Sequence, residues 1–189
     1  MRELGSDELV GVVTAIDNKQ GINWVHFEGR IPDVLITAIP KVRALLPHAT
    51  ISIEFEKPHR EGLLDLLPFP DVAFFSHSYL KHFHLNSATE LFQMMRHKNP
   101  RATFILTAGS EGAYYCTPDL EGAVPTRTVT VVDATGAGDT FIAGFIWASQ
   151  KLGKDIKTSI EFAVNLATTK VAQEGFEGVW EGYLQSTGL

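Results

Sequence analysis

Short apolar segments of strand length alternate along this chain with longer segments of helical periodicity, and this alternation limits the fold more than any other feature. Strands that are apolar on both faces belong inside a sheet that helices cover on both sides. Parallel neighbours also need a helical crossover between them, which the alternation supplies. The sequence therefore predicts an α/β fold with a mostly parallel sheet flanked by helices. The expected strands are residues 24–27, 50–55, 72–75, 103–107 and 113–116, with 128–132 extended, and the expected helices are residues 33–46, 61–66, 87–97, 139–152 and 156–174.

A glycine-rich turn, DATGAGDTF at residues 133–141, leads from the extended residues into a helix. Gly136, Ala137 and Gly138 let a ligand approach the backbone closely, and the first N–H groups of a helix have no partner inside it. With the positive end of the helix dipole, these groups predict an anion site, most often for phosphate. A carboxylate in such a site is electrostatically unfavourable unless it accepts a proton, so Asp139 is a candidate base.

The loop matches neither common nucleotide fingerprint. A P-loop would carry Gly-Lys-Ser/Thr, and a dinucleotide fingerprint would carry a third glycine where this chain has Phe141. A purely structural alternative is that Asp139 caps the helix and the glycines only turn the chain.

The whole run DATGAGDTF resembles the signature of the ribokinase-type carbohydrate kinases, also called the phosphofructokinase-B family. Three further segments look like the ketohexokinase (fructokinase) branch: WVHFEGR at 24–30, ISIEFEKP at 51–58 and GFEG at 175–178. The resemblance implies a ribokinase-like, Rossmann-like fold of three layers. The expected kinase domain covers residues 22–182, between an N-terminal segment at 1–21 and a tail at 183–189.

The resemblance also implies an ATP-dependent kinase that transfers the γ-phosphoryl group to a sugar hydroxyl. Asp139 matches the family's catalytic base, and the amides of Gly136, Ala137 and Gly138 match its anion hole. Phosphoryl transfer depends mainly on positioning and charge stabilisation, so a carboxylate beside an N–H cradle suits it. ATP and Mg²⁺ are the implied cofactors, and fructose is the favoured sugar.

Further positions match nucleotide contacts of the family, in a GxxG turn and on the last long helix: Gly109, Ser110, Glu111, Gly112, Val164 and Asn165. Open α/β sheets bind ligands at the carboxyl ends of strands, where this turn lies. The alternatives are a plain hairpin turn and a core helix whose apolar face includes Val164, Ala167 and Val171. Asp133 and Thr135 match ligands of a monovalent cation such as K⁺ in some relatives.

Two parts of the family pattern are missing. Where relatives carry Asn-x-x-Glu, which helps to hold magnesium and phosphate, this chain reads SHSY at 76–79, and no protein ligand for a metal is predicted. Residues 1–21 resemble neither the N-terminal sugar-binding motif nor the β-lid of relatives, so an N-terminally truncated fold without a β-lid is expected. The uncovered sheet edge predicts self-association or a homo-oligomer. The alternative functions are an inactive nucleotide-binding remnant and an α/β domain whose glycine loop binds another anion or no ligand.

The amino-acid composition limits the kinds of binding partner that are expected. The 22 acidic and 16 basic residues give a net charge of −6, which disfavours nucleic acid or an acidic membrane surface as a partner. The single cysteine, Cys116, cannot form an internal disulfide, and no apolar run approaches the ~20 residues of a membrane span, so a cytoplasmic protein is expected. His77, His82 and His84 lack a standard zinc spacing and are interpreted as part of a polar loop and helix start.

Overall fold

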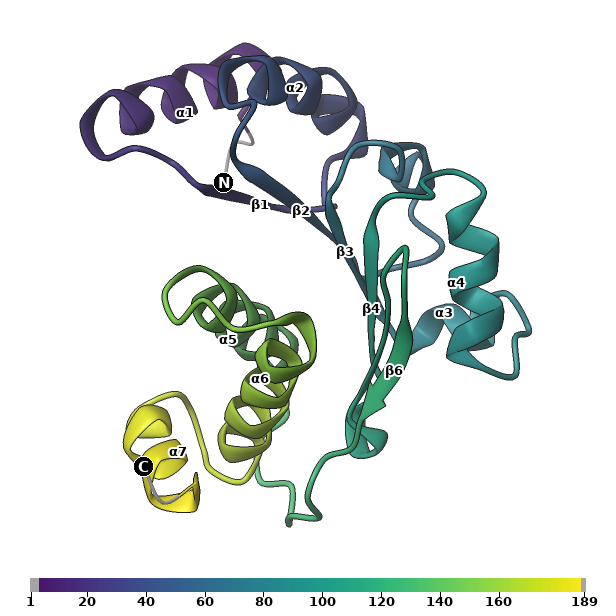
Figure 1. The fold of residues 1–189 in the computed structure, drawn as a ribbon, viewed down its shortest axis with the longest axis vertical. Helices are drawn as coiled ribbons and strands as arrows, with labels where there is room; N and C mark the ends of the chain where they lie inside the picture. Colours follow the sequence, from purple (N-terminus) through teal and green to yellow (C-terminus); the bar gives the residue numbers. More distant parts are fainter. Residues whose placement is uncertain (1–3, 188–189) are drawn as a thin grey trace. The chain divides into compact units, whose positions relative to one another are not determined.

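The computed structural model describes residues 4–187 (Figure 1). Its six-stranded sheet follows chain order, β1-β2-β3-β4-β5-β6, which confirms the predicted α/β fold. The chain divides into two compact units. The first unit holds the residues up to 106 together with 115–121, and the second unit holds 107–114 together with the residues from 122 onward. The predicted domain at 22–182 draws on both units, and residues 1–3 and 188–189 of the predicted terminal segments lie outside the described residues.

Parallel pairing organises the first unit, and β1, β2 and β3 are joined in that way. In the register of these strands, Trp24 lies opposite Thr50 and Ser52 lies opposite Val72. Helix α1 packs beside α2 (Figure 1). The elements of the chain up to residue 107 are α1 (Ser6–Gln20), β1 (Trp24–Glu28), α2 (Pro32–Leu45), β2 (Thr50–Phe55), the 3-10 helix η1 (Leu63–Leu66), β3 (Val72–Ser76), α3 (Ser78–His82), α4 (Ala88–Arg96) and β4 (Thr103–Thr107). The next three elements lie where the chain passes between the two units: η2 (Gly109–Glu111), β5 (Ala113–Cys116) and β6 (Glu121–Val124).

Aromatic side chains form the core of the first unit. Phe55 of β2 stacks on Phe75 of β3 with ring centroids 4.9 Å apart, and Phe75 also contacts Phe104 of β4. Phe92 of α4 stacks on Phe104, so α4 covers this part of the sheet. All four rings are buried, and burying a side chain of this size stabilises a fold by about 1.5–3 kcal/mol. Burial on both faces is the reason that β3 (VAFFS) and β4 (TFILT) have nearly continuous apolar sequences.

The predicted strands match β1 to β5 within one residue at each end, and the helices expected at 33–46 and 87–97 match α2 and α4 equally well. The helices expected at 139–152 and 156–174 differ from the structure by two or three residues at an end. The helix expected at 61–66 is only a 3-10 turn, because Gly62 before it is left-handed and Pro68 follows closely. Residues 128–132 form no strand, and β6 is the last strand instead. The sequence patterns also do not predict α1, which has Gly11 in its middle, or the short elements α3 and α7.

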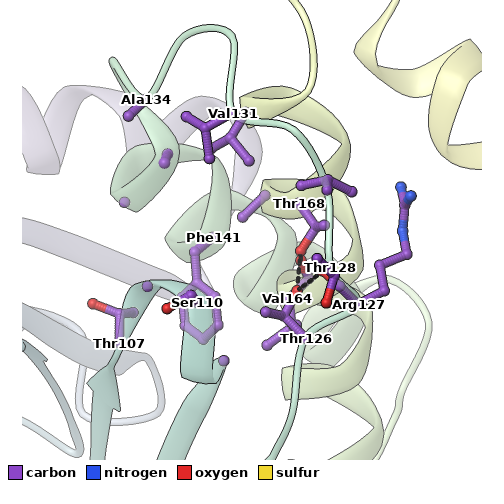
Figure 2. A pocket seen from close by; sticks show the side chains of 17 residues that line it. Thr107, Ser110, Thr126, Arg127, Thr128, Val131, Ala134, Phe141, Val164 and Thr168 are labelled. Atoms are coloured by element: carbon purple, nitrogen blue, oxygen red, sulfur yellow. Dashed lines mark hydrogen bonds between the residues drawn. The ribbon is translucent and has the colours of Figure 1, made fainter.

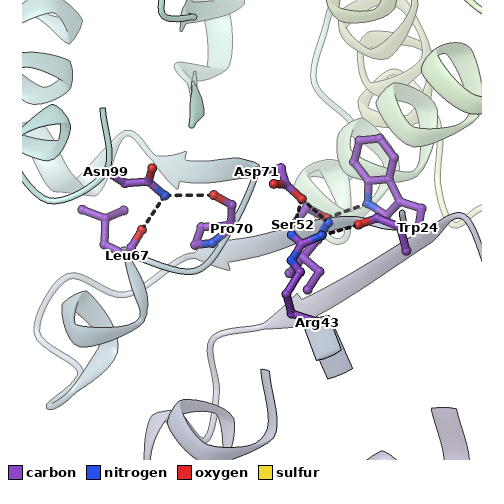
Figure 3. Close-up of polar contacts among 9 residues, drawn as sticks. Trp24, Arg43, Ser52, Leu67, Pro70, Asp71 and Asn99 are labelled. Atoms are coloured by element: carbon purple, nitrogen blue, oxygen red, sulfur yellow. Dashed lines mark hydrogen bonds and ion pairs between the residues drawn. The ribbon is translucent and has the colours of Figure 1, made fainter. Parts of the chain in front are cut away.

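Polar contacts fix the strand ends in the first unit (Figure 3). The Arg43 guanidinium on α2 lies 2.5 Å from Asp71 Oδ2, and the same oxygen accepts the N–H of Ile51 at 2.8 Å. The indole N–H of Trp24 donates to Ser52 Oγ at 2.8 Å, from β1 to β2. The Asp71 contacts connect α2 and β2 to the residue before β3, and the Trp24 contact connects β1 to β2.

Asn99 offers a direct test of this polar framework. Its buried side-chain amide donates to the carbonyl oxygens of Leu67 at 3.0 Å and Pro70 at 2.9 Å. Asn99→Ala leaves both carbonyls without this donor, so we expect the free energy of unfolding in urea to fall by about 1–3 kcal/mol. The control is Asn86→Ala at an exposed position, which should change that free energy by less than about 0.5 kcal/mol. Equal losses in the two variants would contradict a structural role for the Asn99 amide.

Two helices dominate the second unit, α5 (Ala137–Gln150) and α6 (Ile156–Val171). They pack closely at Gly144, where a Cβ would lie 3.2 Å from the Cα of Ala163. Helix α7 (Val179–Thr187) packs against α6. Within residues 4–187, no helix combines the length and the apolar character needed to cross a membrane.

Candidate active site

The glycine loop has a backbone conformation that its sequence explains. Gly136 is the N-cap of α5 and is left-handed, with φ 70° and ψ 14°. A Cβ at Gly136 would lie 2.4 Å from Cζ of Phe176, so both the conformation and the available space require glycine. Helix α5 begins at the next residue, Ala137, whose N–H donates back to the Ala134 carbonyl at 3.2 Å. The loop therefore turns directly into the first helical turn.

Asp139 occupies the third position of α5, and its side chain is exposed. The alternative in which Asp139 caps the helix is wrong, because the N-cap is Gly136. The N–H groups of Gly138 and Asp139 have no acceptor inside the helix, so they are the amides left for an anion. The Asp139 carboxylate thus lies beside the unpaired N–H groups of a helix N-terminus, where the helix dipole favours negative charge.

A cavity of about 350 Å³ lies within the second unit (Figure 2). This volume is in the range of small-molecule sites. The GxxG turn, the start of α5 and one face of α6 contribute predicted site residues to its lining: Gly109, Ser110, Gly112, Ala137, Gly138 and Val164. Among the described residues, the other predicted site positions do not line this cavity: Glu111, Asp133, Thr135, Gly136, Asp139 and Asn165.

The GxxG turn is also the tight connection between two strands that the alternative interpretation proposed. The N–H of Ala108 donates to the Gly112 carbonyl at 2.8 Å and closes the turn, and Gly112 has φ 96°. Glu111 points to a different partner, because its carboxylate accepts the Tyr114 hydroxyl at 2.7 Å. This hydrogen bond raises the pKa of Tyr114. The GxxG segment is therefore both a tight turn between two strands and a part of the cavity lining.

Residues 126–129 and 131 form a cavity wall that the sequence patterns do not predict. The hydroxyl groups of Thr126 and Thr168 are hydrogen-bonded at 2.5 Å (Figure 2). Further along, the N–H of Val132 donates to the Val171 carbonyl at 2.7 Å. The segment is thus fixed to α6 instead of to the sheet, which explains why it forms no strand.

One face of α6 completes the cavity with Val164, Ala167, Thr168 and Val171. Ala167, Thr168 and Val171 lie three, four and seven positions after Val164, which is the pattern of a single helix face. Three of them were expected on a core face, so that interpretation holds only in part: this end of the face lines a cavity. From the predicted contact Val164, the helical period identifies Ala167, Thr168 and Val171 as further residues of the same face.

Asp133 is held by several donors at once. The Lys170 ammonium lies 2.5 Å from Asp133 Oδ2 and donates to the Asp133 carbonyl at 3.0 Å. The carboxylate also accepts the N–H groups of Thr135 at 2.9 Å and Gly175 at 3.2 Å. The hydrogen bond from Lys170, followed by those from Thr135, holds the pKa of Asp133 well below its usual range. The roles of Asp133 and Thr135 as cation ligands stay a prediction.

Histidines and serines gather around a separate cavity in the first unit, which includes His77, His82 and His84. The His82 ring packs edge-on against Phe83 with centroids 4.7 Å apart. Across the described part of the chain, no group of three or more His, Cys, Asp or Glu side chains is placed to hold a metal ion.

Residues 12–180 match the sequence model of the pfkB family carbohydrate kinases. Ketohexokinase of Mus musculus is 30% identical over 168 residues, which cover 82% of this chain and 55% of that protein. Among solved structures, ribokinase of Thermotoga maritima superposes with a TM-score of 0.74 at 16% identity, over 92% of this chain and 59% of that one. Fructokinase of Vibrio cholerae, solved with fructose, ADP and calcium ion, superposes with a TM-score of 0.64 at 20% identity, over 80% of this chain and 55% of that one.

The chain thus spans a little over half the length of these relatives. The two structural matches show the ribokinase-like fold, and the family match includes the glycine loop, the GxxG turn and the cavity that they line. On this evidence, the chain belongs to the pfkB family of carbohydrate kinases.

Proposed function

We propose that this chain carries the nucleotide-binding and phosphoryl-transfer residues of an ATP-dependent sugar kinase of the ketohexokinase type. The observation that carries the proposal is the position of the α5 N-terminus: Ala137 and Gly138 line the cavity, and Asp139 follows in the same helical turn. A ligand in the cavity would therefore have its anionic end at the helix amides, next to a carboxylate.

The cavity walls suit a nucleotide. Val129, Val131, Val164 and Phe141 give apolar surface for a flat base, and threonine hydroxyls add polar contacts. Glycines at both the GxxG turn and the α5 loop let the backbone approach the phosphates. We infer that ATP binds here with its γ-phosphate at Gly138.

In the proposed reaction, Asp139 accepts the proton of the sugar hydroxyl as its oxygen attacks the γ-phosphorus. The bond from that phosphorus to the ADP oxygen breaks, and the phosphoryl group passes to the sugar. The amides of the loop stabilise the charge on the transferring group. ATP enters as its magnesium complex, in which the metal neutralises phosphate charge.

The test is ADP production from MgATP, followed by a coupled assay with a panel of sugars and nucleosides, beside calorimetric measurement of ATP binding. We expect ATP binding and the highest rate with fructose. A chain that does not bind ATP would contradict the proposal. ATP binding without ADP production would instead favour the second candidate, an inactive nucleotide-binding protein.

Ala167 provides a test of the cavity itself, because its small side chain lies in the α6 wall. Ala167→Phe should fill the space for the nucleotide and reduce ATP affinity on the order of tenfold or more, measured by calorimetry. Ala172→Phe is the matched control, since Ala172 is exposed at the end of the same helix and outside the cavity lining. Equal ATP affinity in the two variants would place the nucleotide elsewhere.

A further inference from the structure

Lys170, in the last turn of α6, is fully buried, and the proposed reaction does not use its ammonium group. A buried charge is costly unless it is paired and hydrogen-bonded. Nζ meets two oxygens of Asp133, the carboxylate Oδ2 and the carbonyl. It also lies 5.0 Å from the centroid of the Phe176 ring, where the face of an aromatic ring attracts a cation. The cation therefore has a complete set of partners.

Asp133 and Phe176 connect Lys170 to the glycine loop before α5, here called the anion loop, through two sets of contacts. In the first, the Asp133 carboxylate that binds Lys170 also accepts the Thr135 N–H, one residue before the N-cap of α5. In the second, the Phe176 ring under the ammonium occupies the space against Gly136 where a Cβ would otherwise lie. Through Asp133 and Phe176, Lys170 is thus connected to both sides of the loop that contributes Ala137 and Gly138 to the cavity lining.

We propose that Lys170 is a built-in cation that positions the anion loop, so that the loop needs no bound monovalent metal ion. The Asp133 oxygens suited to K⁺ or Na⁺ are already engaged by the ammonium, so these residues do not fit such an ion. Because the lysine is part of the chain, its charge is present whatever salt surrounds the protein. Lys170 is a positioning residue, since it acts through Asp133 and Phe176.

The inference predicts an unusual salt response. In the wild-type chain, the melting temperature without nucleotide should be the same in potassium, sodium and tetramethylammonium chloride at equal ionic strength. In Lys170→Met, the Asp133 oxygens lose their cation, so the melting temperature should fall and then recover selectively in potassium or sodium chloride. ATP affinity should fall on the order of tenfold in tetramethylammonium chloride, as when an outer-shell partner is lost, and recover in the same way.

Lys157→Met is the matched control, because Lys157 lies on the same helix with an exposed ion pair to Glu161 at 3.7 Å. It should keep the wild-type response in all three salts. Melting that is selectively raised by potassium or sodium in the wild type would overturn the inference, and so would a loss in Lys170→Met that neither salt reverses. If Lys170→Met does not fold, the melting temperatures of the wild-type chain in the three salts test the inference by themselves. The ATP readout depends on the proposed function, whereas the melting readout does not, so failure of ATP to bind bears only on the proposed function.

Discussion

Asp139→Asn is expected to reduce turnover by about 10²- to 10⁴-fold, the usual contribution of a general base. The amide has nearly the same size as the carboxylate but cannot take the proton of the sugar hydroxyl. ATP affinity should stay unchanged, because Asp139 does not line the cavity. The measurements are ADP production with the best acceptor and calorimetric ATP binding, made on the same preparations.

The control for this substitution is Asp155→Asn. Asp155 caps α6 by accepting the N–H of Thr158 at 2.9 Å, and asparagine caps a helix equally well. This variant should therefore keep both turnover and ATP affinity. Retained turnover in Asp139→Asn would remove Asp139 as the base, and a parallel loss of ATP affinity would show that it acts in binding.

Gly112→Ala should lower the free energy of unfolding by about 2–6 kcal/mol. Gly112 has φ 96°, and a Cβ there would lie 2.1 Å from the Val124 carbonyl oxygen and 2.8 Å from the Thr126 nitrogen. The strained backbone costs about 1–3 kcal/mol, and the overpacking costs about 1–3 kcal/mol more. Urea unfolding followed by circular dichroism measures the change.

Gly109→Ala separates these two contributions. Gly109 is also left-handed, with φ 56°, but a Cβ there would meet no atom within 4 Å. Its substitution should cost only the backbone term, about 1–2 kcal/mol. If Gly109→Ala were as destabilising as Gly112→Ala, the contact with the Val124 carbonyl would not be the cause.

Strands β3 and β4 could be predicted because they are buried on both faces and so have nearly continuous apolar sequences. The 3-10 turn at Leu63–Leu66 could not, because it has a helix-like composition but is stopped by its neighbours, Gly62 and Pro68. Within the site, Gly109, Ser110 and Gly112 were predictable from the turn after a strand. Glu111 was not separable from them by sequence, since its side chain turns to Tyr114.

The sequence alone determined the glycine loop, because the conformation at Gly136 and the free amides after it are local properties of a turn that opens a helix. Tertiary packing, by contrast, decided that residues 126–129 and 131 form a cavity wall. It also decided that Lys170 neutralises Asp133, 37 residues away along the chain. Such contacts join segments that are distant in sequence and depend on how these segments pack, so they cannot be predicted from a local period or spacing.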